Sequence, residues 1–248
     1  MIKDIFISIK TYVKALRLIN ELKLWKFFLI PILLGFVLGL FYLSIAYGLS
    51  NKLGNYMASF WFFEFGKSFV VTFSSWIAGF IIFILGIILN KHILMALSAP
   101  FMTPASEKIE AHLTGKPIVK NNSKRDFVSQ LLRSVRINLR NLIKELAITL
   151  PLMILSLIPV VNLIAISLIF YYQSYYTGFG NMDYTLERHL NYTKSKQFVK
   201  KNKGLAIGNG AVFTIMLLIP FIGVMLTLPI AAVASTINTV ERLNLTNK

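Results

Sequence analysis

Long stretches without a formal charge alternate with short basic segments along this chain. Four such stretches cover residues 27–51, 68–90, 146–182 and 204–240. The first two match the roughly 20 apolar residues that a single helix needs to cross a bilayer core. They predict two transmembrane helices, over residues 24–50 and 68–98.

The third and fourth stretches are too long for one crossing, and a proline interrupts each near its middle. Leu157-Ile158-Pro159-Val160-Val161-Asn162 has the same pattern as Leu218-Ile219-Pro220-Phe221-Ile222-Gly223. Proline removes a backbone donor and ends a helix, while asparagine or glycine tolerates the turn that follows. We therefore predict two helical hairpins, over 146–182 and 204–240, with tips at Pro159/Asn162 and Pro220/Gly223. The pattern fits hairpins that dip into the bilayer and hairpins that cross it.

The segments outside these stretches predict helices of a different kind. Residues 1–23 have a broad apolar face (Ile2, Ile5, Phe6, Ile9, Val13, Leu16, Ile19) and basic residues on the other. Such a pattern is typical of an amphipathic helix in the membrane interface, or of one packed on the protein's own helices. Residues 99–145 predict a cytoplasmic helical insert, with one helix beginning at Thr103-Pro104 and ending at Thr114-Gly115.

Composition and charge support an all-α membrane protein, with residues 1–248 forming a single integral membrane domain. Of the 248 residues 56% are hydrophobic, and 26 basic residues against 10 acidic ones give a net charge of +16. Of the basic residues, only Lys52 and Lys67 lie between the first two predicted spans. The remaining cations then face one side, which the positive-inside rule makes the cytoplasm. A multi-pass protein of the cell (inner) membrane is the expectation. Basic residues that flank apolar stretches favour lipid headgroups as partners over nucleic acid.

The residues offer little for catalysis or metal binding. The chain has no cysteine, and His92, His112 and His189 lack ligands at metal-binding spacing, apart from Glu107 and Glu110 near His112. Nucleophile-elbow, Walker and dinucleotide motifs are absent from the sequence. We therefore predict no enzyme, no catalytic residue, no cofactor and no metal.

The other polar groups predict packing contacts. Glu107 and Glu110 are expected to pair with basic residues, and Arg133, Arg136 and Arg140 to contact lipid or a helix rather than form an anion funnel. Gly208-Asn209-Gly210 predicts close helix packing.

Several motifs together resemble one known family. They are Ala99-Pro100-Phe101, Glu107, Glu110, Leu113-Thr114-Gly115, the two Ile-Pro tips, Asp183-Tyr184 and Leu186-Glu187-Arg188. In order and spacing they resemble the CysZ sulfate-transporter family, also called the etoposide-induced membrane protein family. The resemblance covers nearly the whole chain. It implies two long transmembrane helices, two partly penetrating hairpins, sulfate uptake into the cytoplasm without a nucleotide-binding motif, and a homo-oligomer.

The resemblance also implies an oxyanion-binding segment. In the family a short Gly-hydrophobic-Arg-Arg motif precedes the first long helix, and Lys23-Leu24-Trp25-Lys26 stands at that place here. The glycine is replaced, and Lys26 alone keeps a charge at an arginine position. Lysine binds an oxyanion as a point charge, without the planar fork of arginine.

Two hypotheses of function follow. The first is transport of sulfate or a related small oxyanion. The second is a membrane organising or assembly protein that moves no solute and binds lipid or partner proteins through its basic cytoplasmic face.

Overall fold

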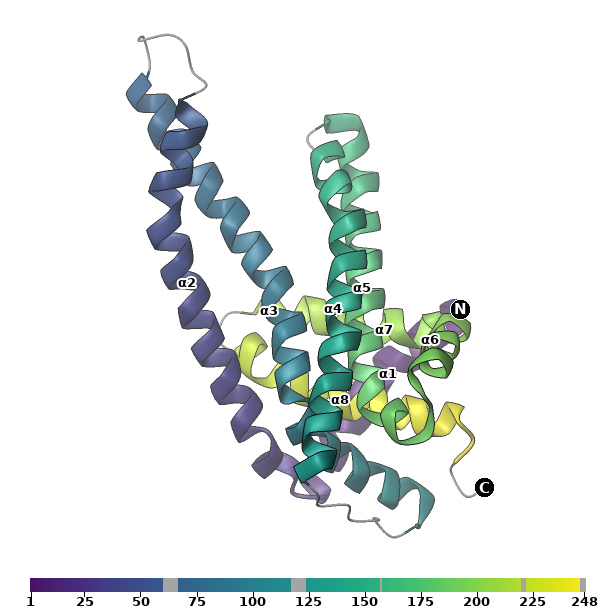
Figure 1. Cartoon of the computed structure of the whole chain (residues 1–248). Coiled ribbons are helices and arrows are strands. Elements are labelled where there is room, and N and C mark those ends of the chain that lie inside the picture. Colours follow the sequence, from purple (N-terminus) through teal and green to yellow (C-terminus); the bar gives the residue numbers. More distant parts are fainter. Residues whose placement is uncertain (60–66, 117–123, 157, 220–221, 246–248) are drawn as a thin grey trace. The chain divides into compact units, whose positions relative to one another are not determined.

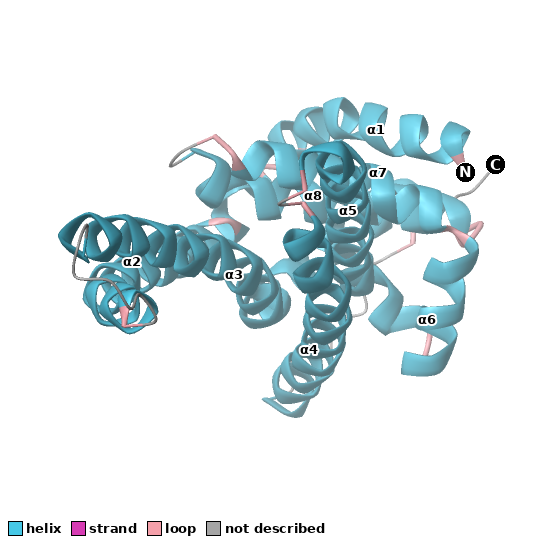
Figure 2. Ribbon diagram, turned by 90° about the horizontal axis from the view of Figure 1, so that it is seen from above, coloured by secondary structure: helices cyan, strands magenta, loops and turns pink. Residues whose placement is uncertain are grey.

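A computed structural model describes residues 1–59, 67–116, 124–156, 158–219 and 222–245 of the chain. The described residues form helices and no strand (Figures 1 and 2). In chain order the elements are α1 (Ile2–Glu21), the 3-10 helix η1 (Leu24–Phe27), α2 (Leu29–Ala58), α3 (Lys67–Thr114), α4 (Lys124–Leu155), α5 (Pro159–His189), α6 (Tyr192–Lys201), α7 (Lys203–Leu217) and α8 (Ile222–Arg242). The predicted all-α class is therefore confirmed.

The chain divides into two compact units. The smaller unit, residues 35–91, contains most of α2 and the first half of α3. Within it the two helices approach closely, because a Cβ added at Gly86 on α3 would lie 3.6 Å from Cδ1 of Tyr42 on α2. The larger unit comprises residues 1–34 and 92–248, and it contains the polar clusters described below.

The larger unit is built around α5, which packs against α4, α7 and α8. Glycines bring α5 and α7 unusually close. A Cβ at Gly178 would lie 1.9 Å from the Ala206 carbonyl oxygen, and one at Gly210 would lie 1.8 Å from the Ser174 carbonyl oxygen. Small residues let two helix backbones approach each other in this way. The predicted packing role of the Gly208–Gly210 segment is thus confirmed.

Helix α1 lies against α7 and α8 through one face. Its buried residues are Ser8, Thr11, Tyr12, Ala15, Leu18 and Ile19. Tyr12 donates a 2.7 Å hydrogen bond to the Asn209 carbonyl oxygen, and Ser8 donates a 3.0 Å bond to the Leu205 carbonyl oxygen. Several apolar side chains of α1 remain exposed, among them Ile2, Phe6, Val13 and Leu16. The predicted amphipathic helix therefore packs on its own protein and also has a free apolar strip.

One predicted helix start is wrong, because a longer helix continues through it. Helix α3 runs without a break to Thr114, so no helix begins at Thr103-Pro104. The Thr103 hydroxyl donates to the Ala99 carbonyl oxygen one turn back instead of capping a new helix. The predicted end is confirmed, since Gly115 follows with a φ of 67°. The described part of residues 99–145 is helical and comprises the end of α3 and the first part of α4; its role as a cytoplasmic insert stays a prediction.

The two predicted turns at Ile-Pro sequences separate consecutive helices. Helix α4 ends at Leu155 and α5 begins with Pro159 at its first position, where a missing N–H costs nothing. Figure 1 shows α4 and α5 side by side with this turn at one end. Helices α7 and α8 are separated by residues 218–221, of which Pro220 and Phe221 lie outside the described residues. Pro151 and Pro229 lie inside α4 and α8, so proline alone does not mark a turn.

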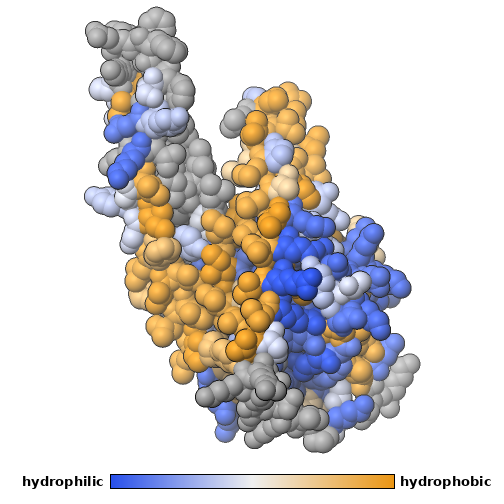
Figure 3. All heavy atoms as spheres, in the orientation of Figure 1, coloured by the Kyte–Doolittle hydropathy of each residue, from blue (hydrophilic) through white to orange (hydrophobic). Residues whose placement is uncertain are grey.

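Apolar and polar surfaces are segregated in the larger unit. Exposed apolar side chains gather on the outer part of α4 and α5, among them Leu150, Ile154, Ile158, Val160 and Leu163. Figure 3 shows this apolar arm and, around α6, a hydrophilic area. Exposed apolar area of this extent on helices is typical of contact with lipid or another protein.

Candidate functional site

The segment predicted to bind an oxyanion forms a tight turn between α1 and α2. Lys23 has φ 50° and ψ 48°, which lies in the left-handed region, and η1 follows at once. The turn that glycine would allow is thus formed although lysine stands there. Left-handed backbone costs an L residue roughly 1–2 kcal/mol. Surrounding contacts must therefore hold this conformation.

Apolar and aromatic contacts anchor the turn. Leu24 and Phe28 are fully buried. Trp25 donates a 2.8 Å hydrogen bond from Nε1 to Oδ1 of Asn20, near the end of α1. Its ring packs edge-on against Phe28, with 5.5 Å between centroids. Leu24 and Trp25 therefore position η1, whereas the exposed Lys23 and Lys26 remain accessible to an anion.

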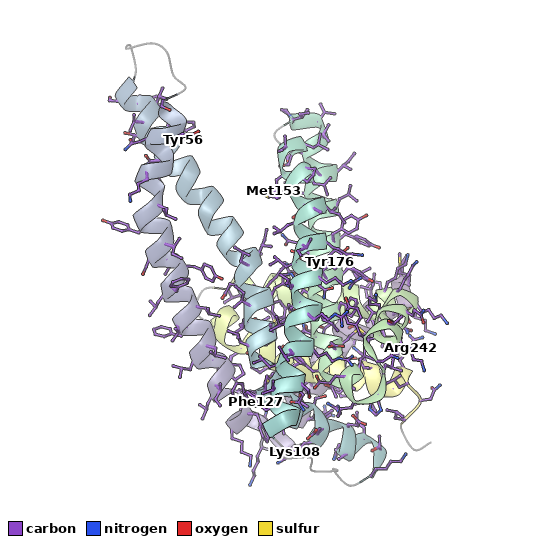
Figure 4. All side chains as sticks on the ribbon, in the orientation of Figure 1. Tyr56, Lys108, Phe127, Met153, Tyr176 and Arg242 are labelled. Carbon is purple, nitrogen blue, oxygen red and sulfur yellow. The ribbon has the colours of Figure 1, made fainter. Side chains whose placement is uncertain are left out.

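A third lysine, Lys108, which the sequence did not indicate, lies beside this turn. Nζ of Lys26 is 5.5 Å from the centroid of the Phe27 ring, and Nζ of Lys108 on α3 is 5.2 Å from the same centroid. Both distances are within the range of a cation–π contact. Figure 4 labels Lys108 on the C-terminal part of α3. The residues around Lys108 in the sequence do not indicate this contact, because Lys108 and Phe27 are about 80 residues apart in the chain.

The turn stands at the beginning of an apolar helix long enough to cross a membrane. Among the described residues one segment, Leu24–Leu49, meets the length and composition of a span. Lys23 directly precedes this segment and Lys26 lies in its first turn. Basic side chains at such a border reach the headgroup region.

The α4–α5 tip does not join this site. Asn162 lies in the first turn of α5 beside Pro159, and its Oδ1 is buried without a hydrogen-bond partner among the described residues. Figure 1 shows this tip at the opposite end of α4 from η1. Gly223 lies in the first turn of α8, where a Cβ would be 2.1 Å from the Met216 carbonyl oxygen. Gly223 therefore allows close packing of α7 on α8.

The arginines of α4 make helix contacts, as predicted. Arg133 donates 2.9 Å hydrogen bonds from Nη2 to both Asp183 and Ser195, and a 2.8 Å bond from Nη1 to the Leu190 carbonyl oxygen. The guanidinium carbons of Arg136 and Arg140 lie 4.3 Å and 5.2 Å from the Tyr192 and Phe179 rings. These contacts hold α4 on α5 and on the start of α6.

A second cluster joins α3 to the end of α5. Glu110 accepts a 2.7 Å hydrogen bond from Nη2 of Arg188, and its other oxygen lies 2.8 Å from Nε2 of His189. Burial raises the pKa of Glu110, but the hydrogen bonds with His189 and Arg188 outweigh it, so the pKa lies below its ordinary value. The predicted pairing of Glu110 with basic residues is confirmed. For Glu107 it stays a prediction.

Glu187 precedes Arg188 of this cluster in sequence, but its carboxyl group is more deeply buried than that of Glu110. Its Oε1 is 2.5 Å from the Thr103 hydroxyl oxygen. Burial raises the pKa of Glu187 to about 7, and the Thr103 hydrogen bond opposes that shift. Near neutral pH a large share of Glu187 is therefore protonated. The Thr103 hydroxyl, which can donate to Oε1 of Glu187 or to the Ala99 carbonyl oxygen, connects this carboxyl group to the backbone of α3.

Pairs of a histidine and a carboxylate stabilise contacts between helices. His92 on α3 and Glu145 on α4 are almost fully buried, with 2.9 Å between Nε2 and Oε2. In the part of the chain that the structure describes, three or more His, Asp or Glu side chains do not come together as a metal would require.

Together these features define an all-helical protein with a cationic turn at the start of a helix that is long and apolar enough to cross a membrane. The chain belongs to the family described as "Sulfate transporter CysZ/Etoposide-induced protein 2.4", whose model matches residues 11–227. The predicted family is confirmed.

Curated relatives carry the name "Sulfate transporter CysZ". One from Pseudomonas syringae pv. tomato is 30% identical over 142 residues, which are 57% of this chain and 56% of the relative. One from Pseudomonas fluorescens is 28% identical over 142 residues, 57% of either chain. One from Pseudomonas aeruginosa is 27% identical over 161 residues, 64% of this chain and 65% of the relative. The chain thus aligns with less than two thirds of each relative's length. All three are named as transporters, in agreement with the prediction of a protein that is not an enzyme.

Proposed function

We propose that this protein carries sulfate, or a related small oxyanion, across a cell membrane into the cytoplasm. Relatives named as sulfate transporters support the substrate. Within the chain the proposal depends on one observation. Lys23 and Lys26, both exposed, stand on an anchored turn at the start of an apolar helix.

The turn provides an entrance for a divalent anion. An ammonium group binds sulfate by charge and by hydrogen bonds, which are stronger than those between neutral groups. The buried Leu24 and the Trp25–Asn20 hydrogen bond fix the backbone, so that little order is lost when the anion binds. No step in this account requires ATP, and the sequence contains no nucleotide-binding motif.

The membrane arrangement is part of the proposal. Helix α2 and the first half of α3 cross the bilayer, while the α4–α5 and α7–α8 turns enter it with their apolar ends. The many basic residues of α4, α6 and the chain ends then face the cytoplasm. Assembly into a homo-oligomer stays a prediction from the family resemblance.

Growth on sulfate tests the function in cells. A bacterial strain without its own sulfate importers is transformed with the wild type, with Lys26→Ala, or with Lys10→Ala as a control on the exposed side of α1. We expect the wild type and Lys10→Ala to restore growth on sulfate as sulfur source, and Lys26→Ala to restore it poorly at low sulfate. Membrane levels of each variant are compared by immunoblot.

Absence of growth with every variant, despite equal amounts of protein in the membrane, would contradict sulfate import. It would favour the alternative of an organising protein that binds lipid or protein partners through its basic face.

A further inference from the structure

Two lysines from distant parts of the chain approach one aromatic ring beside the entrance turn. Nζ of Lys26 and Nζ of Lys108 lie 5.5 Å and 5.2 Å from the centroid of Phe27. All three residues belong to the larger unit of the fold. The quadrupole of the ring attracts each cation, so Phe27 places two ammonium groups in the same neighbourhood.

Neither ammonium group is neutralised by a carboxylate among the residues that the structure describes. Four other cations of the same unit are paired with a carboxylate: Arg133 with Asp183, Arg188 with Glu110, Lys14 with Glu241, and Arg242 with Asp4. Two uncompensated like charges near each other repel and create a positive local potential. An anion with two negative charges removes that repulsion when it binds.

Lys108 is less exposed than an ordinary surface lysine. Its side chain is half-buried, and on either side of it along α3 Ala105 and Ile109 are buried. The nearest acidic residues of its own helix do not compensate it. Glu110 binds Arg188 and His189, and Glu107 is adjacent in sequence, where helical side chains do not face each other.

We infer that Lys108 is a second cationic contact of the oxyanion site, and that with Lys26 it selects a dianion over a monoanion. This inference deepens the proposed function and rests on it. Sulfate has two charges and four acceptor oxygens, so it can accept hydrogen bonds from both ammonium groups at once. Nitrate, with a single charge, gains less from the second lysine.

Sulfate uptake into proteoliposomes tests the inference through Lys108→Met, which keeps the length and the apolar stem but removes the charge. We expect its KM for sulfate to rise about tenfold, since a charged hydrogen bond is lost. Its maximal rate should change little. Competition by nitrate should become stronger relative to the wild type. Lys108→Arg, which keeps the charge, should leave the KM within about threefold.

Lys10→Met, an exposed lysine on α1 outside the turn, serves as the matched control and should behave like the wild type. Thermal unfolding of each purified variant establishes that it is folded, and Lys108→Gln replaces Lys108→Met if the latter does not fold. If the wild type takes up sulfate and Lys108→Met has the same KM and the same nitrate competition, Lys108 has no role in the site. The proposed transport would then remain intact. A wild type without sulfate uptake would overturn both.

Discussion

At the scale of single residues, the backbone of Lys23 shows how a predicted site residue forms its turn. The family motif has glycine at this place, and lysine replaces it here. The structure keeps the turn with a left-handed lysine, because Leu24, Trp25 and Phe28 anchor the residues that follow. Such compensation arises from tertiary packing and cannot be predicted from the four residues of the motif.

Lys23→Gly tests whether the turn is strained. Glycine adopts a positive φ without the Cβ penalty, so we expect the variant to gain about 0.5–1 kcal/mol of stability. Lys23→Ala removes the same charge but keeps a Cβ, and it should gain nothing. Thermal unfolding of the detergent-purified proteins measures both. Equal stabilities of the glycine and alanine variants would contradict the strain.

Glu187 gives the fold a pH dependence. Its pKa is raised from 4.5 to about 7 by burial, so its contribution to stability is complete below about pH 4.5. That contribution is lost as the pH rises through 7, by up to about 3 kcal/mol. Glu187→Gln, neutral at every pH, should therefore be more stable than the wild type at pH 8, with a smaller difference at pH 5.

The exposed Glu241 provides the matched control for this pH experiment. Glu241→Gln removes a carboxylate that pairs with Lys14 at the surface, and exposed pairs contribute little. Melting temperatures from pH 5 to pH 8 should follow the wild type in this variant. If Glu187→Gln also follows the wild-type curve, the raised pKa is wrong.

At the scale of elements, the sequence predicted the class and the turn at Pro159 better than the helix boundaries. Charge-free stretches indicate which residues avoid water, but not where a helix ends. Helix α3 continues through Thr103-Pro104, and α4 begins at Lys124, well before the apolar stretch. Clusters such as Glu110–Arg188–His189 depend on how α3 and α5 pack, which no local pattern reports.

The contact of α5 with α7 depends on glycines. In Gly210→Ala the new methyl group would meet the Ser174 carbonyl oxygen at 1.8 Å, so the helices must separate at a cost of about 1–3 kcal/mol. Gly39→Ala on α2 is the control, because no atom lies within 4 Å of its added Cβ. We expect a lower melting temperature for the first variant alone. Equal melting temperatures would show that α5 and α7 are less close than described.

The exposed apolar strip of α1 predicts contact with lipid. Because the chain has no cysteine, Phe6→Cys can be labelled with an environment-sensitive dye. When the labelled protein is in liposomes, the emission of the dye should lie at a shorter wavelength than in the denatured protein without detergent, as expected for an interfacial apolar face. Lys14→Cys, on the basic side of α1, should shift much less. Identical spectra at both positions would contradict the interfacial orientation.

At the scale of the whole molecule, the proposed function depends on three features: the membrane location, the orientation and the oxyanion entrance. Membership of the family places the protein in a membrane; in the proposed function the basic segments orient it, and the cationic turn is the proposed entrance for an oxyanion. Composition was enough to predict the membrane, and the orientation stays a prediction from charge placement. The third required contacts between η1 and α3 that link Lys26 to Lys108, and these became visible only in the folded chain.

The most direct test is uptake of labelled sulfate into liposomes that contain the purified wild-type protein, compared with protein-free liposomes. The account predicts protein-dependent uptake without ATP that saturates with sulfate and is lowered by excess unlabelled sulfate or thiosulfate. Uptake no faster than in protein-free liposomes, with the protein folded and inserted, would contradict the proposed transport.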